Sequence, residues 1–222
     1  MIDWQAIALT ARLAACTAML LLALGLPIAY WLATSRWGGR MFVEAIVAMP
    51  LVLPPTVIGF YVLVALGPRS GLGRGIEGLT GHLLPFSFGG LLVASVLYSL
   101  PFAVQPFTAA IRSVDWTLVE AAQTMGASPW QTLRRIIWPL ALPGITVGLV
   151  LSFAHTLGEF GVVLMVGGNI AGQTRTISIA IYDQVQSLDY ASASANSLVL
   201  LATSFGILTI AYFVQHRIFR VS

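Results

Sequence analysis

The sequence contains no lysine, and all 11 of its basic residues are arginines. A P-loop of the form GxxxxGK[ST] needs that lysine to contact the phosphates of a nucleotide, so this chain cannot form one. Any ATP hydrolysis must come from another polypeptide, and we predict a chain that is not an enzyme and holds no cofactor. The single cysteine, Cys16, excludes an intrachain disulfide and a cysteine-based metal site.

Charged residues are also scarce. They make up 9% of the 222 residues, whereas hydrophobic residues make up 58% and the mean hydropathy is +0.89. These values are typical of a protein that crosses the membrane several times. We therefore expect lipid around the chain, and we expect no nucleic-acid partner.

Five apolar runs approach or exceed the ~20 residues that a membrane-spanning helix needs. We predict an all-α fold with one transmembrane domain, residues 1–222, whose first apolar run is retained because it is longer than a signal-peptide core. Residues 1–10 are predicted to be a short lead and residues 67–89 an exposed loop. The predicted spans are residues 13–34, 42–66, 88–111, 140–166 and 198–214.

Two of these spans contain more than one proline. Pro54 and Pro55 remove two backbone donors from the second span, and Pro101 and Pro106 flank Gln105 in the third. Both helices are predicted to be interrupted. A break at membrane depth is tolerated only where it packs on protein or faces a water-filled path. Both readings stay open.

The fourth predicted span carries His155 and Glu159 on successive turns, and Gly144 and Gly148 near its start predict a close helix contact. A lone histidine in a span usually makes an interhelical hydrogen bond. Glu159 must be paired or hydrated at this depth, and we expect it to accept hydrogen bonds from the glycine-rich backbone that follows. The candidate path-lining residues are Pro54, Pro55, Thr56, Pro101, Gln105 and Glu159.

Residues 115–139 predict two short helices that meet at a corner, which we call the elbow. Asp115 can cap the first helix, and Gly126 suits a positive φ at its end. Ser128 and Gln131 form an S-x-x-Q capping box for the second helix. Prolines at positions 139 and 143 mark its expected end. The elbow is either an amphipathic pair on the membrane surface or a docking site for another protein.

Arginine placement predicts the orientation. Cytoplasmic ends of spans carry the excess of arginine and lysine. We therefore expect the N-terminus outside, and the elbow and C-terminus in the cytoplasm. The arginines on the predicted cytoplasmic side are Arg36, Arg40, Arg112, Arg134, Arg135, Arg217 and Arg220, against Arg12, Arg69, Arg74 and Arg175 on the other side.

Part of the elbow resembles the EAA loop of bacterial ABC importer permeases, which reads EAA, three residues, G, nine residues, I-x-L-P. Glu120-Ala121-Ala122 and Gly126 match this pattern, and Trp138 stands where the family has leucine. The resemblance implies that the elbow docks on a separate ATPase subunit. The residues assigned to this coupling are Glu120, Ala121, Ala122, Gly126, Arg134 and Arg135.

Three further segments are similar to the molybdate branch of these permeases: LVLPPTVIG at 51–59, LGEFG at 157–161 and GNIAGQTRT at 168–176. The likeness implies a homodimer in the bacterial inner membrane that transports molybdate and accepts tungstate. It also implies two ATPase subunits that bind ATP and Mg²⁺, and a periplasmic oxyanion-binding protein.

The residues alone are also compatible with other functions. Sulfate permeases share some of these segments. A proton-coupled secondary anion transporter could use Glu159 and His155 as a relay, and a membrane scaffold would not transport at all. Secondary transporters often contain internal repeats, and no second copy of the elbow is present in the sequence. No arginine lies in the middle of a predicted span, so tight anion binding is expected on another protein.

Overall fold

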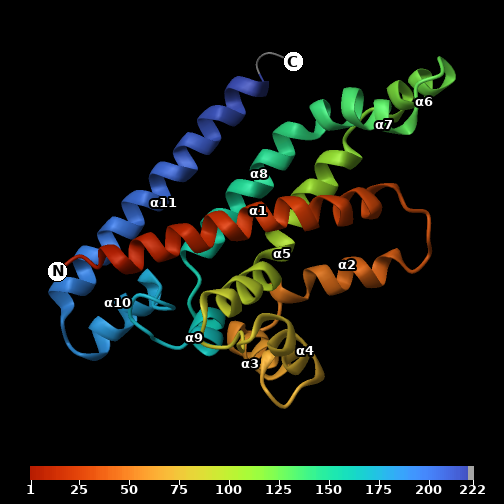
Figure 1. Cartoon of the computed structure of the whole chain (residues 1–222). Helices are drawn as coiled ribbons and strands as arrows, with labels where there is room; N and C mark the ends of the chain where they lie inside the picture. Colours follow the sequence, from red (N-terminus) through yellow and green to blue (C-terminus); the bar gives the residue numbers. More distant parts are fainter. Residues whose placement is uncertain (220–222) are drawn as a thin grey trace.

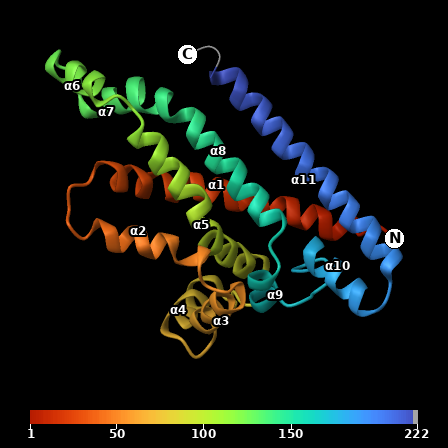
Figure 2. The ribbon, with the colours of Figure 1, turned by 180° about the vertical axis from the view of Figure 1, so that it is seen from behind.

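The computed structural model describes residues 1–219, and side chains up to residue 213, and that part of the chain is helical without β-strands. Figures 1 and 2 show a few long helices running through the molecule, with shorter ones beside and between them. The helices are α1 (Trp4–Thr34), α2 (Arg40–Ala48), η1 (Met49–Leu51), α3 (Pro55–Leu66), α4 (Gly71–Thr80), α5 (Phe88–Arg112), α6 (Trp116–Thr124), α7 (Pro129–Thr132), η2 (Leu133–Ile137), α8 (Trp138–Leu157), α9 (Gly161–Gly167), α10 (Ile177–Gln186) and α11 (Tyr190–Phe219).

Four stretches of helix are long and apolar enough to cross a membrane, and the bent pair formed by α2 to α3 would make a fifth span. The predicted all-α class with about five spans is confirmed. The predicted cytoplasmic placement of the Arg217 side chain, of Arg220 and of the C-terminal Ser222 concerns parts of the chain outside the described residues.

Helix α1 begins nine residues before the predicted span, so the short lead predicted for residues 1–10 is wrong. The carboxylate of Asp3 accepts a hydrogen bond from the backbone N–H of Ala6 and caps the helix at its start. The 31 residues of α1 extend roughly 46 Å at about 1.5 Å per residue, which exceeds the ~30 Å of a bilayer core. The helix is therefore more than long enough to cross the apolar layer.

The second predicted span is sharply bent. Helices α2 with η1 and α3 meet at 110°, and Pro54 and Pro55 lie at the corner. Pro55 is the first residue of α3, a position where the missing N–H costs nothing. The predicted break is confirmed, and its angle is too large for a kink within one continuous helix.

Helix α5 runs without interruption through Pro101 and Pro106, so the predicted break in the third span is wrong. The helix packs between α1 and α8, and prolines inside a membrane helix are tolerated where neighbouring helices protect the freed backbone groups. A Cβ atom at Gly148 would lie 2.7 Å from the ring of Phe107. The close contact predicted from the glycines of α8 is therefore confirmed.

The fourth predicted span breaks after Leu157. The chain turns through residues 158–160 and continues as α9, which packs against α3. A Cβ atom at Gly161 would lie 2.8 Å from Cβ of Pro55, and one at Gly59 would lie 2.7 Å from Cβ of Met165. The breaks of the second and fourth spans therefore pack directly on each other, through two glycines.

The glycine-rich segment 67–89 was predicted to be a loop, but residues 71–80 of it form α4. Ser70 caps this helix by accepting a hydrogen bond from the N–H of Gly73. Gly73 also lies against the backbone of Leu66 and Gly67, where no side chain would fit. Capping and packing outweigh the low helix propensity of glycine here.

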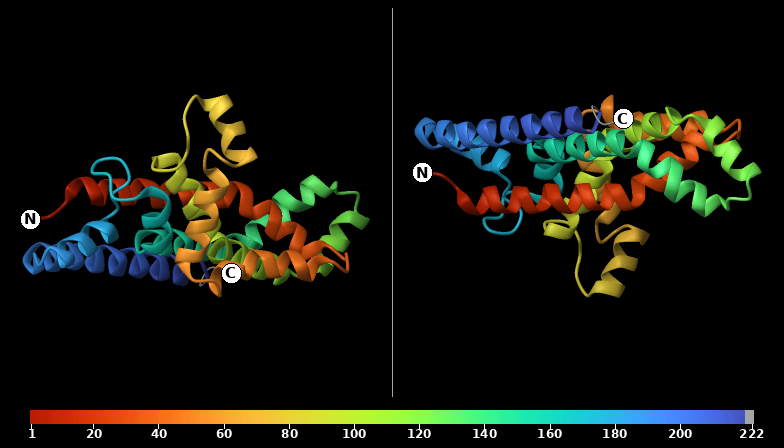
Figure 3. Two further views of the ribbon diagram at one scale, coloured as in Figure 1. Left: turned by 90° about the horizontal axis from the view of Figure 1, so that it is seen from below. Right: turned by 90° about the horizontal axis from the view of Figure 1, so that it is seen from above.

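The last two helices are α10, which Thr176 caps by accepting a hydrogen bond from the N–H of Ile179, and the largely exposed α11. Asn196, near the start of α11, accepts a hydrogen bond from the N–H of Asp3, so the N-terminus lies beside the beginning of the last helix. Figure 3 shows the N-terminus at the opposite end from α6 and α7.

This arrangement predicts that the N-terminus and the elbow lie on opposite sides of the membrane. In a Cys16→Ser background, cysteines introduced at Ile2 and at the exposed Met125 should react with a membrane-impermeant thiol reagent from opposite sides of sealed vesicles. Vesicles opened with detergent give the control, in which both cysteines react. Labelling of both from the same side of sealed vesicles would contradict the arrangement.

Candidate functional site

The elbow forms as the sequence predicts. The carboxylate of Asp115 caps α6 by accepting hydrogen bonds from the hydroxyl and from the backbone N–H of Thr117, at 2.7 and 2.9 Å. These bonds lower the pKa of Asp115 below its usual value, because they stabilise the charged form. The start of α6 is thus defined by a local interaction at the membrane edge.

The corner between the two helices depends on Gly126, which has a φ of +88°. The N–H of Ala127 reaches back to the carbonyl of Ala122 at 3.0 Å and satisfies one of the last carbonyls of α6. A Cβ atom at Gly126 would meet no other atom within 4 Å. Glycine is therefore required by backbone conformation and not by space.

The second helix of the elbow starts with the predicted capping box between Ser128 and Gln131. It does not end at the prolines, as was predicted, but continues as η2, a turn of π-helix, into α8. The N–H of Trp138 bonds to the carbonyl of Leu133, five residues earlier, immediately before Pro139. This local change of hydrogen-bond register carries the helix past a residue that has no N–H.

The proposed coupling residues differ in exposure. Glu120 and Ala121 are exposed, whereas Ala122 is buried, so the second alanine supports the elbow from inside and does not form part of its outer face. Met125, at the tip, is 82% exposed. Sequence reasoning missed this methionine, although its place beside the corner glycine was a usable signal. Arg134 and Arg135 both lie exposed in η2.

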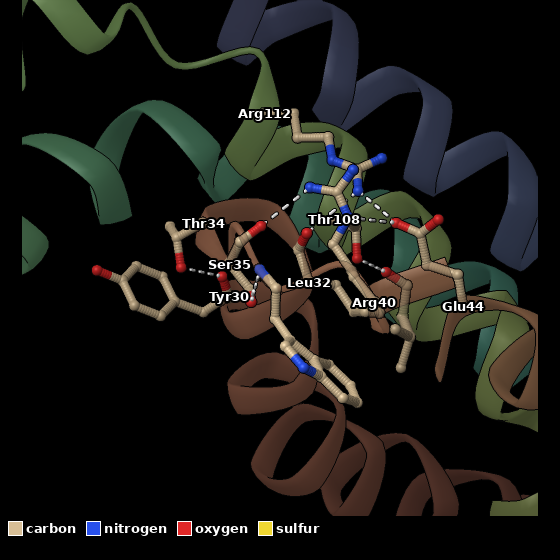
Figure 4. Close-up of polar contacts among 10 residues, drawn as sticks. Tyr30, Leu32, Thr34, Ser35, Arg40, Glu44, Thr108 and Arg112 are labelled. Atoms are coloured by element: carbon tan, nitrogen blue, oxygen red, sulfur yellow. Dashed lines mark hydrogen bonds and ion pairs between the residues drawn. The ribbon is translucent and has the colours of Figure 1, made fainter. Parts of the chain in front are cut away.

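A cluster of charges lies at the base of the elbow (Figure 4). The Nη2 atom of Arg112, the last residue of α5, is 2.5 Å from Oε1 of Glu44 in α2, and it donates to the carbonyl of Leu32 at 3.1 Å. Arg40 also pairs with Glu44, at 3.5 Å. Arg112 thus joins the ends of α1 and α5 to α2 just before the elbow begins.

Glu44 was not singled out from the sequence, although its i,i+4 spacing from Arg40 was visible. The Arg112–Glu44 pair is about 40% exposed on each side, so it contributes only ~0.2 to 1 kcal/mol. It borders a cavity of about 520 Å³ between α2 and α5, into which Gln105 also faces. Of the predicted path residues, Gln105 is the one that lines this cavity.

The remaining path candidates do not converge on one cavity. Pro54 and Thr56 are exposed and Pro55 is half-buried at the bend, whereas Pro101 is buried inside the helix bundle. Glu159 is 4% exposed and lies where α8 ends. These positions divide into a surface group at the bend and a buried group behind it.

Neither carboxylate oxygen of Glu159 has a hydrogen-bond partner among the described residues, so the expected bonds to the glycine-rich backbone are wrong. Ser95 and Tyr98 of α5 are its polar neighbours, and the hydroxyl of Ser95 is likewise without a partner. The chain after Glu159 turns at Phe160 and folds into α9, and none of the N–H groups at the start of that helix forms a hydrogen bond with the carboxylate.

His155 makes the interhelical hydrogen bond that was predicted. Its Nδ1 atom lies 2.9 Å from the hydroxyl of Ser99 in α5, and its ring stacks on Phe102 at 3.9 Å between centroids. Among the described residues, no three His, Cys, Asp or Glu side chains are grouped so that they could hold a metal ion. His155 is thus part of the packing between α5 and α8.

The sequence is similar to several known transport proteins. The family model described as "binding-protein-dependent transport system inner membrane component" matches residues 25–220. The molybdenum transport system permease protein ModB of Azotobacter vinelandii is 49% identical over 202 residues, which is 90% of this chain and 89% of that protein. ModB of Escherichia coli K12 is 34% identical over 220 residues, 99% of this chain and 95% of that one. A probable sulfate transport system permease protein, cysT of Chlorella vulgaris, is 33% identical over 214 residues, 96% and 80% of the two chains.

Solved structures share the fold. A bacterial alginate ABC transporter in complex with its alginate-bound periplasmic protein matches with a TM-score of 0.78 at 23% identity, over 96% of this chain and 78% of that one. The inward-facing MetNI methionine ABC transporter matches with a TM-score of 0.74 at 17% identity, over 96% and 94%. The family match and the close relatives cover nearly the whole chain. The chain therefore belongs to the binding-protein-dependent transport system inner membrane components, as a non-catalytic permease subunit of an ABC importer.

Proposed function

We propose that this chain, with a second copy of itself, forms the translocation path of a molybdate importer of the bacterial inner membrane, and that tungstate is also transported. The observation that supports molybdate as the substrate is the 49% identity, over 90% of the chain, to the molybdenum transport system permease protein of Azotobacter vinelandii. The sulfate permease of Chlorella vulgaris is 33% identical. Sulfate is therefore the alternative substrate.

The positions of the arginines support a permease that does not itself bind the anion tightly. A tetrahedral dianion is held tightly by arginines or by clustered backbone donors. Arg40 and Arg112 lie at helix ends, and Arg12 of α1 packs on the ring of Phe88 at 4.6 Å. We propose that a periplasmic oxyanion-binding protein holds the substrate tightly, and that the permease only passes it on. Two ATPase subunits bind ATP and Mg²⁺ and supply the energy.

The bend between α2 and α3 supports a dimer with the path between two copies. Leu51 and Val52, at the bend, are 48% and 85% exposed, and Pro54 and Pro55 leave carbonyls there without helical donors. Such backbone is tolerated in a membrane only against protein or beside a water-filled path. A second copy placed against the bend provides both, with Thr56 facing the path and Glu159 behind it.

Orientation is part of the same proposal. Arg36, Arg40 and Arg112 lie at the end of the molecule from which the elbow projects, together with the two arginines of η2. The positive-inside tendency places this end in the cytoplasm and the N-terminus in the periplasm. In this orientation the elbow faces the compartment that contains ATP. The accessibility experiment on Ile2 and Met125 also assigns the side.

The substrate is tested by uptake into proteoliposomes that contain the permease, its ATPase and its binding protein. We expect ATP-dependent molybdate uptake that excess tungstate suppresses and that an equal excess of sulfate leaves nearly unchanged. Sulfate that competes as well as tungstate would assign the chain to sulfate transport. Uptake driven by a pH gradient without ATP would contradict the proposal as a whole.

The elbow is tested at Gly126. A β-branched residue in the left-handed region costs ~1 kcal/mol or more, so Gly126→Val should misdirect α7 while the spans still insert. We expect normal amounts in the membrane, but loss of the ATPase on purification or hydrolysis that no longer drives uptake.

The matched control is Gly126→Asn, because asparagine tolerates a positive φ and there is free space for its side chain. It should keep most of the coupled uptake. Glu120→Ala should also be mild, since an exposed ion pair at such a contact is worth only ~0.2 to 1 kcal/mol. Normal transport by Gly126→Val would contradict a coupling role for the elbow.

Substitutions of Glu159 distinguish a structural role of this side chain from a role as a proton relay. Glu159→Gln keeps the shape of the buried side chain, whereas Glu159→Ala leaves a cavity behind the bend. We therefore expect Glu159→Gln to retain most of the uptake and Glu159→Ala to lose more of it, with a lower melting temperature. Equal loss of uptake in both variants, with unchanged melting temperatures, would indicate a role for the proton or charge.

A further inference from the structure

A deep cleft lies on the side of the helix bundle next to the elbow. It has a volume of about 690 Å³ and runs between the second half of α1 and the start of α8, with Ile111 of α5 among its lining residues. Its walls include Leu26, Ala141 and Ile145, which belong to helices long enough to cross the membrane. The walls of the cleft therefore belong to the part of the protein that crosses the membrane.

One charged residue lines this apolar cleft. Arg134 of η2 is part of its wall, whereas the adjacent Arg135 is not. Arg134 has no hydrogen bond or ion pair with any described side chain or backbone group, and it is exposed. The guanidinium of Arg134 is therefore free to pair with an anion beside the apolar wall, and its planar group fits phosphate oxygens.

Three aromatic side chains complete the lining. Trp130 and Trp138, 68% and 37% exposed, come from α7 and α8, and Tyr30 comes from α1. Tryptophan and tyrosine are enriched where the apolar layer of a membrane meets its headgroups. Their presence beside Arg134 assigns this end of the cleft to the headgroup level, while its aliphatic walls extend toward the middle of the bilayer.

We propose that this cleft binds an anionic phospholipid, with its phosphate at Arg134 and an acyl chain along the aliphatic walls. Basic pockets between membrane helices are known to select anionic headgroups, and the volume is within the range of about 300 to 1,000 Å³ for small-molecule sites. The lipid would contact both α1 and η2, the π-helical turn between the elbow and α8. The bound lipid would therefore stabilise the elbow against the spans.

The experiment measures lipid bound to the detergent-purified complex of permease and ATPase by native mass spectrometry, during titration with phosphatidylglycerol or phosphatidylcholine. We expect about one tightly bound phosphatidylglycerol per permease chain, with an affinity roughly fivefold above that of phosphatidylcholine. Arg134→Gln should abolish this preference. Arg135→Gln, which removes a neighbouring exposed arginine outside the cleft, should keep it.

A second variant tests the apolar part of the site. Leu26→Trp fills the cleft without changing its charge and should weaken the binding of both lipids, with the complex still assembled. Equal effects of Arg134→Gln and Arg135→Gln would overturn the proposal, because they would indicate general attraction to a basic surface. Wild-type protein without a preference for phosphatidylglycerol would also overturn it. Neither result would depend on which anion the importer transports.

Discussion

The structure depends most on the need to satisfy every backbone polar group where no water is available. The second and fourth predicted spans are both interrupted, at the corner before Pro55 and at residues 158–160. The chain packs these breaks on each other, and Gly59 and Gly161 allow α3 and α9 to approach so closely that an added Cβ would clash. A single broken span would expose unpaired backbone groups at a high cost in free energy. Two broken spans in contact shield the backbone groups of each other.

The unbroken helices give this chain a rigid link between the membrane and the elbow. Helix α5 lies between α1 and α8, and Val114 in its connection to α6 and Val119 within α6 belong to the main hydrophobic cluster. On its other side the elbow joins α8 through η2 without a gap in the helix. A displacement of the elbow therefore reaches two core helices directly, without a flexible linker.

The polar groups around this core act at different depths. Arg112 ties α1, α2 and α5 together near the membrane surface, through partly exposed contacts that are individually weak. His155 joins α5 to α8 farther along the bundle, through Ser99. Glu159 lies still deeper in the protein without a partner, which makes the region behind the bend its least satisfied part. Rearrangement of the two bends would cost least there.

Local chemistry explains what could be predicted from the sequence. The number of spans followed from runs of apolar residues, and the elbow followed from Asp115, Gly126 and the Ser128–Gln131 capping box, because caps and corners depend on neighbours in the chain. The break at Pro54 and Pro55 was predictable for the same reason. The family was recognisable because these local signals fall at the spacing of the EAA loop.

Only the tertiary structure decided which prolines break a helix and which glycines belong to one. Pro101 and Pro106 remain inside α5 because neighbouring helices hold it, and the glycines of 71–80 form α4 because they pack on the end of α3. The Arg112–Glu44 contact joins residues 68 positions apart, and the cleft beside Arg134 needs α1 against α8. Such features depend on which helices become neighbours, and the local pattern of a single sequence does not contain that information.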